Sequence, residues 1–498
     1  MAKAIMFLGT GSDVGKSIVS AAFCRIFKRR GYKVAPFKAQ NMSNNSFVTV
    51  EGGEIGRAQV VQAEAAGLLP SVHMNPILLK PSSEQGSQVI LQGKVFGSMD
   101  AGRYYELKPL LQKTVMESYE KLARDYDVIV MEGAGSCCEM NLKENDLVNF
   151  PMARKTNAPC ILIGDIDRGG IFAQLIGSFY LMSRKEREIT GGFLINKFRG
   201  DPKLFETGMD YLEKKTGKSG LGLVPFYADI RIDSEDSVAV QEDRFLRQPV
   251  GPKTVNVAVL KFPAISNFTD VEGLADEPDV AVHYLFRPEE LSRKYDCLIL
   301  PGTKNAMEDA LWLSRSGWKK EIRRFSESKG VILGICGGYQ ILGRVIKDPL
   351  GVESSRKEVP GVGILPIETV LASEKVVRKV TGICLTNRKK INGYEIHMGR
   401  SRPLNETGTP FLRIHEPGKR RTWEDGWSLD NGRIAGAYVH GILDCPAFKG
   451  DFLNALRREK GLRERAPKKG RMARFHEYDK LADHFEEHCR VDRIEALL

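Results

Sequence analysis

The stretch GTGSDVGKS, residues 9–17, decides the fold of the first half of the chain. An apolar run at 2–8 precedes it, and a helical pattern at 18–29 follows it. A buried strand, a glycine loop and a helix in this order form a cradle for phosphate, because backbone N–H groups and the helix dipole face the anion. We expect Lys16 to neutralise the phosphate and Ser17 to ligate Mg²⁺.

The glycines of this loop are expected to bind ATP as well. Gly11 and Gly15 let the backbone come close to the phosphates. The spacing is a variant, because Thr10 stands where a regular Walker loop has glycine. A tight turn with an incidental lysine is the alternative interpretation.

Apolar strands alternate with helical patterns along the rest of this half. The alternation predicts an α/β fold with a mostly parallel sheet, in which ligands bind beyond the carboxyl ends of the strands. Polar residues stand at those ends. The strands expected at 34–37, 127–131, 159–164 and 192–195 are followed by Lys38, Glu132, Asp165 and Asn196.

Three of these strand-end residues suit a nucleotide site. Glu132 is expected to hold Mg²⁺ opposite Ser17. Lys38 is expected to neutralise the transferring phosphate, and Asn196 to read the nucleotide base. For Lys38, a solvated loop lysine is the competing interpretation.

The motif DIDRGG at 165–170 supplies further candidates. Asp165 and Asp167 are expected to orient metal or substrate, and Arg168 to bind a carboxylate. Each of them is also of a type that caps loops, so a structural role stays open.

A second stretch with chemical significance is GICGGYQ, residues 334–340, which follows the apolar run 330–334. A strand, a turn of small residues and a helix form a nucleophile elbow, which holds its side chain strained at the end of a strand. Cys336 is therefore expected to be the catalytic nucleophile, because a helix N-terminus favours the thiolate. Taken alone, an inert buried thiol is the alternative.

A histidine suited to accept the thiol proton occurs farther along the chain. His440 ends the apolar strand of AYVHG at 437–441. The backbone N–H groups of Gly337 and of Gly302, which follows a strand expected at 296–300, are candidates for the oxyanion hole. This pairing strengthens the catalytic interpretation of the cysteine.

Length and composition limit the class of protein. A chain of 498 residues is too long for one core, and 42% hydrophobic with 28% charged residues is typical of a soluble globular protein. Because there is no signal-peptide pattern and no long apolar run, we expect a cytoplasmic protein without a membrane partner. The nine cysteines lack metal or disulfide spacing. The net charge of +11 is spread along the chain, which suits small polyanionic substrates as well as nucleic acid.

The two centres together predict an amidoligase. A thiolate with an oxyanion hole releases ammonia from glutamine, and a phosphate loop lets ATP activate a carboxylate as an acyl phosphate. Ammonia then displaces the phosphate to form an amide.

Ten motifs in order carry a resemblance to a known family. They are GTGSDVGKS (9–17), KAQNMSNN (38–45), GRAQVVQAEAAG (56–67), MNPILLKP (74–81), EGAGS (132–136), DIDRGG (165–170), NKFRGD (196–201), GICGGYQ (334–340), YEIHMGR (394–400) and YVHG (438–441). Over essentially its whole length, the chain resembles the cobyric acid synthases, glutamine-dependent amidotransferases of cobalamin biosynthesis.

The resemblance implies a domain plan and a reaction. It implies a P-loop, dethiobiotin-synthetase-like ATP domain at 1–240 and a class I glutamine amidotransferase domain of flavodoxin-like α/β fold at 254–448. Loss of apolar periodicity and a rise in charge predict a linker at 241–253. The amphipathic pattern and mixed charges of residues 449–498 predict a C-terminal helical tail. The implied reaction amidates the b, d, e and g carboxylates of adenosylcobyrinic acid a,c-diamide to give adenosylcobyric acid. ATP, Mg²⁺, glutamine and a corrinoid are then required, and neither a tightly bound organic cofactor nor nucleic acid is expected.

One position departs from most class I glutaminases, which place an orienting glutamate two residues after the histidine. Ile442 stands there, a departure that the cobyric acid synthases share. Asp444 is the nearest acidic candidate to orient His440. The weakened triad predicts slow glutamine hydrolysis in the absence of the other substrates.

Some alternatives stay open. The motif YEIHMGR, with Glu395 and His397, is either part of an interdomain cleft or a structural strand. A cobyrinate a,c-diamide synthase has a similar two-domain plan. A partitioning-type P-loop ATPase shares the variant loop but gives Cys336 no task, and a nucleic-acid-binding protein is favoured by charge alone.

Overall fold

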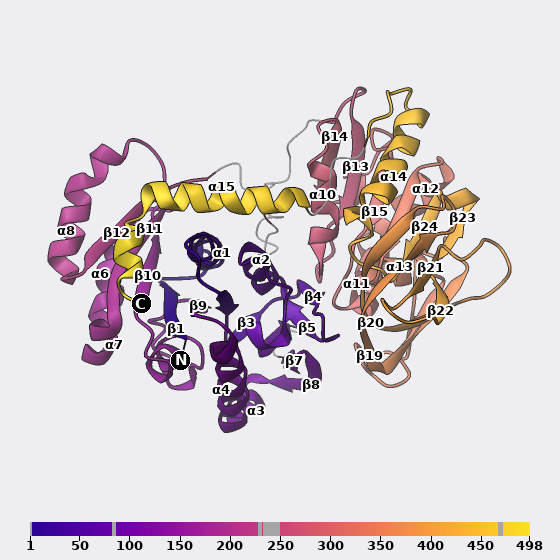
Figure 1. Cartoon of the computed structure of the whole chain (residues 1–498). Coiled ribbons are helices and arrows are strands. Elements are labelled where there is room, and N and C mark those ends of the chain that lie inside the picture. The colour runs from indigo at the N-terminus through magenta and orange to yellow at the C-terminus, as the bar shows by residue number, and fades with distance from the viewer. Residues whose placement is uncertain (1, 82–85, 228–231, 233–249, 467–471) are drawn as a thin grey trace. The chain divides into compact units, whose positions relative to one another are not determined.

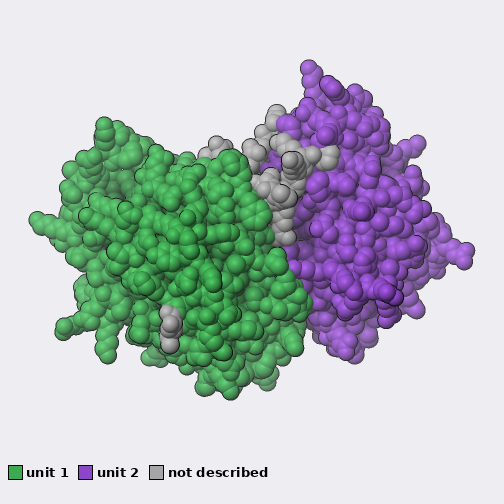
Figure 2. All heavy atoms as spheres, in the orientation of Figure 1, with its two compact units in different colours: residues 1–43, 49–233, 472–498 green, residues 44–48, 234–471 purple. Residues whose placement is uncertain are grey.

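The computed structural model describes residues 2–81, 86–227, 232, 250–466 and 472–498. The chain forms two compact units (Figure 2). Unit 1 comprises Met1–Ser43, Thr49–Asp233 and Met472–Leu498, and unit 2 comprises Asn44–Val48 and Ser234–Arg471. Most of the linker predicted at 241–253 lies outside the described residues.

Unit 1 is built on a six-stranded parallel sheet in the order β12-β11-β10-β1-β9-β2. Its strands are apolar runs without alternation because most of their residues are buried on both faces of the sheet. The predicted α/β class is confirmed. The bounds are β1 (Lys3–Gly9), β2 (Val34–Phe37), β9 (Val128–Glu132), β10 (Cys160–Asp165), β11 (Thr190–Phe198) and β12 (Ser219–Pro225).

Helices and a smaller sheet complete unit 1 (Figure 1). The smaller sheet has the order β3-β6-β7-β8. Its strands are β3 (Gln40–Met42), β6 (Ile77–Pro81), β7 (Gly86–Leu91) and β8 (Lys94–Asp100), and the short β5 spans Glu54–Gly56. The helices are α1 (Lys16–Arg29), α2 (Arg57–Ala65), α3 (Ala101–Glu106), α4 (Lys108–Asp125), α5 (Phe150–Lys155), α6 (Ile171–Leu181), α7 (Arg184–Ile189) and α8 (Glu206–Thr216).

The end of the chain returns to unit 1 as α15 (Met472–His488) and α16 (Val491–Glu495). Helix α15 runs beside α1 (Figure 1), where the Arg25 guanidinium donates to Asp479 at 2.7 and 2.9 Å. Phe485 is buried against the ring of Phe23, with 6.4 Å between ring centroids. The segment predicted as one tail at 449–498 is therefore divided, because α14 (Pro446–Glu459) belongs to unit 2 and α15 has its own apolar stripe.

Unit 2 is built on a second six-stranded sheet, in the order β14-β13-β15-β16-β24-β23. All pairs are parallel except β23 with β24. The strands are β13 (Val255–Leu260), β14 (Val280–Leu285), β15 (Cys297–Leu300), β16 (Val331–Ile335), β23 (Trp427–Leu429) and β24 (Ile434–Ala437). The helices are α10 (Glu272–Ala275), α11 (Ala306–Arg315), α12 (Trp318–Glu327), α13 (Gly337–Leu342) and α14.

A second sheet of unit 2 is dominated by a long antiparallel pair, β19 (Ile367–Cys384) with β20 (Lys390–Pro403). The other strands are β17 (Val345–Lys347), β18 (Glu358–Pro360), β21 (Leu412–His415) and β22 (Thr422–Asp425). The short β4 (Ser46–Val48) also belongs to this unit. Within the described part of the chain, every helix is too short or too polar to cross a bilayer.

Candidate active sites

The glycine loop of unit 1 leads from β1 directly into α1, as predicted. Gly15 caps the helix at φ 98°, a left-handed conformation that favours glycine. The Lys16 ammonium donates to the carbonyl oxygens of Gly11 at 2.8 Å and of Gly135 at 3.0 Å. The lysine therefore ties the glycine loop to the turn that follows β9.

Glu132 lies at the centre of a buried cluster beside the loop. Its Oε1 accepts from Ser17 Oγ and from Lys38 Nζ, both at 2.8 Å. Its Oε2 accepts from Gln62 Nε2 at 2.6 Å and from Gln59 Nε2 at 3.3 Å. Burial raises the pKa of Glu132, but Lys38, Gln62 and Ser17 outweigh burial and hold the pKa below its usual value. The cluster keeps a carboxylate ionised and brings together three predicted site residues, Ser17, Lys38 and Glu132.

Asn196 and Asp165 flank the same loop at the ends of β11 and β10. Asn196 Nδ2 donates to the Val14 carbonyl at 2.9 Å. Lys197 Nζ bridges Asp165 Oδ2 at 2.7 Å and the Asp13 carbonyl at 2.6 Å. Both predicted residues thus support the loop, and their contacts with base, metal or substrate stay predictions.

The two remaining candidates of this edge lie on an exposed turn. Asp167 forms an ion pair with Arg199 at 2.5 Å, and its backbone N–H donates to Asp165 Oδ1 at 2.8 Å. Arg168 is exposed on the same turn. These contacts fit the loop-capping alternative for Asp167 without testing a substrate role.

Cys336 stands in unit 2 between β16 and α13, as the elbow pattern predicts. Its φ of 51° and ψ of −108° are unusual for a residue with a side chain, and such strain is common at catalytic turns. The turn needs Gly338, because a Cβ there would lie 2.0 Å from the Leu300 carbonyl oxygen. The thiol is buried, with 7% exposure, and its Sγ is 3.5 Å from the Ile396 carbonyl oxygen.

The two predicted oxyanion glycines both border this site. A Cβ on Gly337 would lie 3.0 Å from the Thr303 backbone nitrogen, and one on Gly302 would lie 3.1 Å from His440 Cε1. The loop after β15 and the start of α13 therefore come close together beside the histidine. Donation of their N–H groups to an oxyanion stays a prediction.

His440 has an acidic partner that the sequence did not reveal. Its Nδ1 lies 2.7 Å from Asp270 Oδ2, and the N–H of Gly441 donates to Asp270 Oδ1 at 2.8 Å. Burial lowers the pKa of His440, but hydrogen bonds and charge from Asp270 and Cys336 outweigh burial and raise the pKa to about 10. The carboxylate that meets His440 is thus Asp270 rather than Asp444, because a distant turn folds back onto the histidine.

The motif YEIHMGR forms part of β20 and contacts both His440 and Cys336. Tyr394 exchanges two backbone hydrogen bonds with His440, at 3.2 and 2.9 Å, and their rings stack with 5.3 Å between centroids. Two residues on, the Ile396 carbonyl is the oxygen beside Cys336 Sγ. Within unit 2 the motif therefore acts as a structural strand along the site.

Four residues of these centres were missed in the sequence. Gln59 and Gln62 stand in the motif GRAQVVQAEAAG, and their i, i+3 spacing puts both on one face of α2. Tyr394 lies in a motif whose role was left open. No local pattern marks Asp270.

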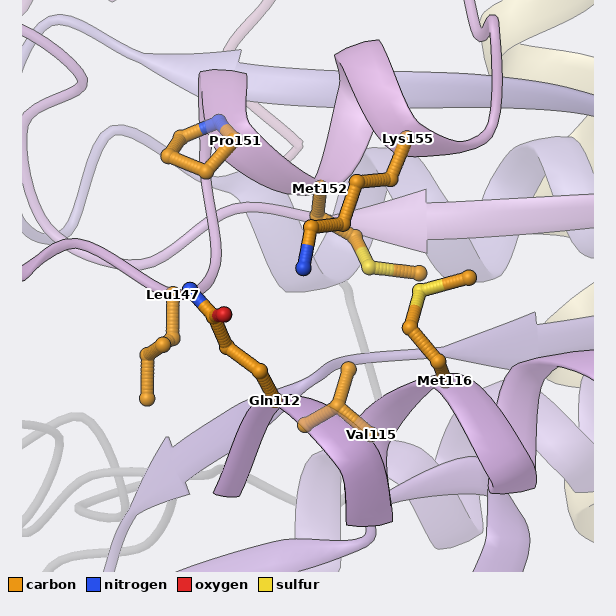
Figure 3. Close-up of a pocket in the computed structure, with 7 residues that line it drawn as sticks. All are labelled: Gln112, Val115, Met116, Leu147, Pro151, Met152 and Lys155. Carbon is orange, nitrogen blue, oxygen red and sulfur yellow. The ribbon is translucent and has the colours of Figure 1, made fainter. Parts of the chain in front are cut away.

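A small hollow of unit 1 is lined mainly by α4 and α5 (Figure 3). The lining is largely apolar and contains none of the predicted site residues. Its lining residues are Gln112, Val115, Met116, Leu147, Pro151, Met152 and Lys155. We assign it no part in the chemistry.

Two protein-family models match the chain. The CobQ/CobB/MinD/ParA nucleotide binding domain matches residues 5–239, and the CobB/CobQ-like glutamine amidotransferase domain matches residues 256–448. Together with the phosphate loop and the cysteine–histidine site, these matches define a class of enzyme. It is a nucleotide-using ligase of the glutamine amidotransferase type.

Curated relatives narrow the class to a family. The chain is 47% identical over 508 residues to the cobyric acid synthase of Syntrophobacter fumaroxidans, covering 100% of this chain and 99% of the relative. It is 45% identical to that of Pelodictyon phaeoclathratiforme (100% and 97% covered) and 46% identical to that of Thermoanaerobacter sp. strain X514 (97% and 96% covered). The chain belongs to the cobyric acid synthase family of cobalamin biosynthesis, and the predicted resemblance is confirmed.

Proposed function

We propose that the chain uses glutamine and ATP to amidate the b, d, e and g carboxylates of adenosylcobyrinic acid a,c-diamide, giving adenosylcobyric acid. The observation that carries this proposal is the full-length similarity to cobyric acid synthases, joined to two centres whose side chains suit the two half-reactions. The corrinoid and its four carboxylates come from the family alone.

The glutaminase half-reaction would take place at Cys336. The Cys336 thiolate attacks the side-chain amide carbon of glutamine, and the N–H groups of Gly302 and Gly337 stabilise the oxyanion. His440 gives its proton to the departing ammonia, leaving a thioester that water hydrolyses to glutamate. The raised pKa of His440 supports this role, because the imidazolium is then present at neutral pH as a proton donor.

The ligase half-reaction would take place at the glycine loop. Lys16 and Lys38 neutralise the γ-phosphate while a substrate carboxylate attacks it, so that ADP leaves and an acyl phosphate forms. Ammonia then displaces phosphate to give the amide. Gly11 and Gly15 cradle the phosphates, Asn196 contacts the base, and Asp165, Asp167 and Arg168 are the candidates for holding substrate.

Mg²⁺ fits the donors at this loop. The hydroxyl of Ser17 and the carboxylate of Glu132 are hard oxygen ligands that lie side by side, and Mg²⁺ in phosphoryl transfer commonly takes one or two protein ligands plus phosphate oxygens. When bound, the ion would neutralise charge on the β- and γ-phosphates. Lys38, Gln62 and Ser17 hold the Glu132 carboxylate ionised, as Mg²⁺ binding requires.

The test is mass spectrometry of the corrinoid after reaction with Mg-ATP and either glutamine or ammonia. Wild type is expected to add four amides from both nitrogen sources. Cys336→Ala should lose the glutamine reaction, by at least about 10³-fold for removal of a nucleophile, and keep the ammonia reaction. The matched control is Cys297→Ala, a fully buried thiol in β15 of the same sheet, which should keep both.

Two outcomes would reject the proposal. If wild type hydrolyses ATP without amidating this corrinoid, the substrate is wrong. If it instead amidates two carboxylates of cobyrinic acid, the a,c-diamide synthase alternative holds.

A further inference from the structure

We propose that Asp270 is the positioning residue of the glutaminase centre, supplied by a turn 170 residues before His440 rather than by the position two residues after it. The inference rests on the proposed glutaminase function and adds a residue to it. Asp270 acts through His440, so we do not place it among the catalytic residues.

Both oxygens of Asp270 are engaged at the histidine. Oδ2 meets His440 Nδ1 at 2.7 Å, and Oδ1 accepts from the Gly441 N–H at 2.8 Å. The two side chains of the pair are 2% exposed. Because the carboxylate binds both the imidazole ring and the backbone N–H of the next residue, it fixes the orientation and the position of the imidazole.

This contact also selects the tautomer. A carboxylate accepts only, so Nδ1 carries the proton and Nε2 is free to exchange one with Cys336, the other partner that raises the pKa of His440. The groups that face the ring are Asp270, Cys336 and the stacked ring of Tyr394. Burial alone would favour the neutral imidazole, and the carboxylate reverses that preference.

The turn that carries Asp270 is itself held firmly. It is the short 3₁₀ helix Phe268–Val271, which begins after Asn267 in a left-handed conformation at φ 50°. Asn267 Oδ1 accepts from Ser46 N at 3.1 Å, and its Nδ2 donates to Tyr394 Oη at 3.4 Å. Tyr394 Oη in turn donates to the Ser46 carbonyl at 3.3 Å. These bonds lie within unit 2 and fix the carboxylate before any substrate binds.

The inference changes one expectation drawn from the sequence. Slow basal glutamine hydrolysis was predicted because His440 had no orienting group two residues on. With Asp270 in place that reason disappears, and the histidine is held as in a complete triad.

The experiment compares Asp270→Asn with Asp444→Asn, which changes the acidic residue nearest to His440 in the sequence. In Asp270→Asn one of the two carboxylate oxygens is replaced by an NH₂ group, which can only donate. This group must face either His440 Nδ1 or the Gly441 N–H, and both of these are donors in wild type. We expect kcat for glutamine hydrolysis to fall about 10²–10⁴-fold, with KM changed little, as expected for an imidazole held in the wrong tautomer. Ammonia-dependent amidation should be unchanged, and Asp444→Asn should stay near wild type in both reactions.

Two further readouts separate positioning from folding. The wild-type rate should fall as the pH rises through about 10, where His440 loses its proton, and the fall should come at lower pH in Asp270→Asn. Alkylation of the Cys336 peptide by iodoacetamide should slow roughly tenfold in Asp270→Asn near neutral pH, because an imidazolium no longer stabilises the thiolate. Asp270→Glu, which keeps the carboxylate, should regain part of both.

The outcomes are distinct. Full activity and unchanged alkylation in Asp270→Asn, or a larger loss in Asp444→Asn, would overturn the inference. If wild type hydrolyses no glutamine although Cys336 alkylation still depends on Asp270, the positioning role is supported and the proposed function fails.

Discussion

A buried carboxylate lies at the centre of the candidate site in each unit, and the two carboxylates differ in their hydrogen-bond partners. Glu132 is surrounded by four side-chain donors, from Ser17, Lys38, Gln59 and Gln62. Asp270 has one imidazole and one backbone N–H. A ring of donors with a fixed cation stabilises a permanent charge, whereas an imidazole partner can gain or lose a proton. We infer that the site around Glu132 keeps a permanent negative charge, whereas Asp270 supports proton transfer at His440.

Apart from the changes at Cys336 and Asp270, the largest expected effect comes from Glu132→Gln. The substitution removes the carboxylate proposed to hold Mg²⁺ beside Ser17, so amidation should fall about 10³-fold with glutamine and with ammonia alike, because the charge on the phosphates would no longer be neutralised as well. Glutamine hydrolysis at Cys336 should persist. The measurement is amide formation from each nitrogen source beside glutamate release.

This result sharpens the contrast because Asp270→Asn should give the reverse pattern. Loss of the glutamine-dependent reaction alone would identify Asp270 as the carboxylate that supports proton transfer. Loss of amidation from both nitrogen sources would identify Glu132 as the carboxylate needed at the phosphate loop. Ammonia-dependent amidation by Glu132→Gln within a few-fold of wild type would contradict the assignment.

The next effect is on stability and comes from Lys38→Met. It leaves the charge of Glu132 buried without its cation, which should cost about 3 kcal/mol of unfolding free energy, as for other broken buried pairs. The double variant Lys38→Met/Glu132→Gln carries no lone buried charge and should recover most of the loss. Urea denaturation of the three proteins measures the difference, and equal midpoints would show that Lys38 does not stabilise Glu132.

The same pair predicts a dependence on pH. The pKa of Glu132 is lower in the folded protein than in the unfolded chain, so its stabilising contribution is present above the ordinary carboxyl range and is lost as the pH falls through the folded value. Without Lys38, burial should favour the protonated form of Glu132 in the folded protein. The difference in free energy of unfolding between wild type and Lys38→Met should therefore become smaller as the pH falls toward about 4–5.

The contrast also explains what the sequence could predict. Glu132 ends an apolar strand that pairs with the strand leading into the glycine loop, so strand order and loop chemistry place it correctly. Cys336 and its elbow follow from local residues in the same way. Asp270 meets His440 across 170 residues through a left-handed turn at Asn267, and no local pattern encodes that return. Likewise, charge and amphipathicity predicted a helix near the C-terminus, but not that α15 would pack on α1.

The smallest expected effect tests how firmly Asp270 is held. Tyr394→Phe keeps the ring stacked on His440 and removes the hydroxyl bonded to Asn267 and Ser46. Loss of these long hydrogen bonds is worth about 1 kcal/mol, so kcat for glutamine hydrolysis should fall roughly fivefold, while ammonia-dependent amidation is unaffected.

The control for this variant is Tyr295→Phe, which removes another buried hydroxyl of unit 2, whose hydrogen bond to His283 Nδ1 is also long at 3.4 Å. It should leave glutamine hydrolysis unchanged, since His283 and Tyr295 have no part in the site. If the two variants behave alike, the network behind Asp270 does not position it, and the carboxylate depends only on its own contacts with His440 and Gly441. If glutamine hydrolysis falls only in Tyr394→Phe, the position of Asp270 depends on the hydrogen bonds of Asn267, Ser46 and Tyr394 as well as on its own two contacts.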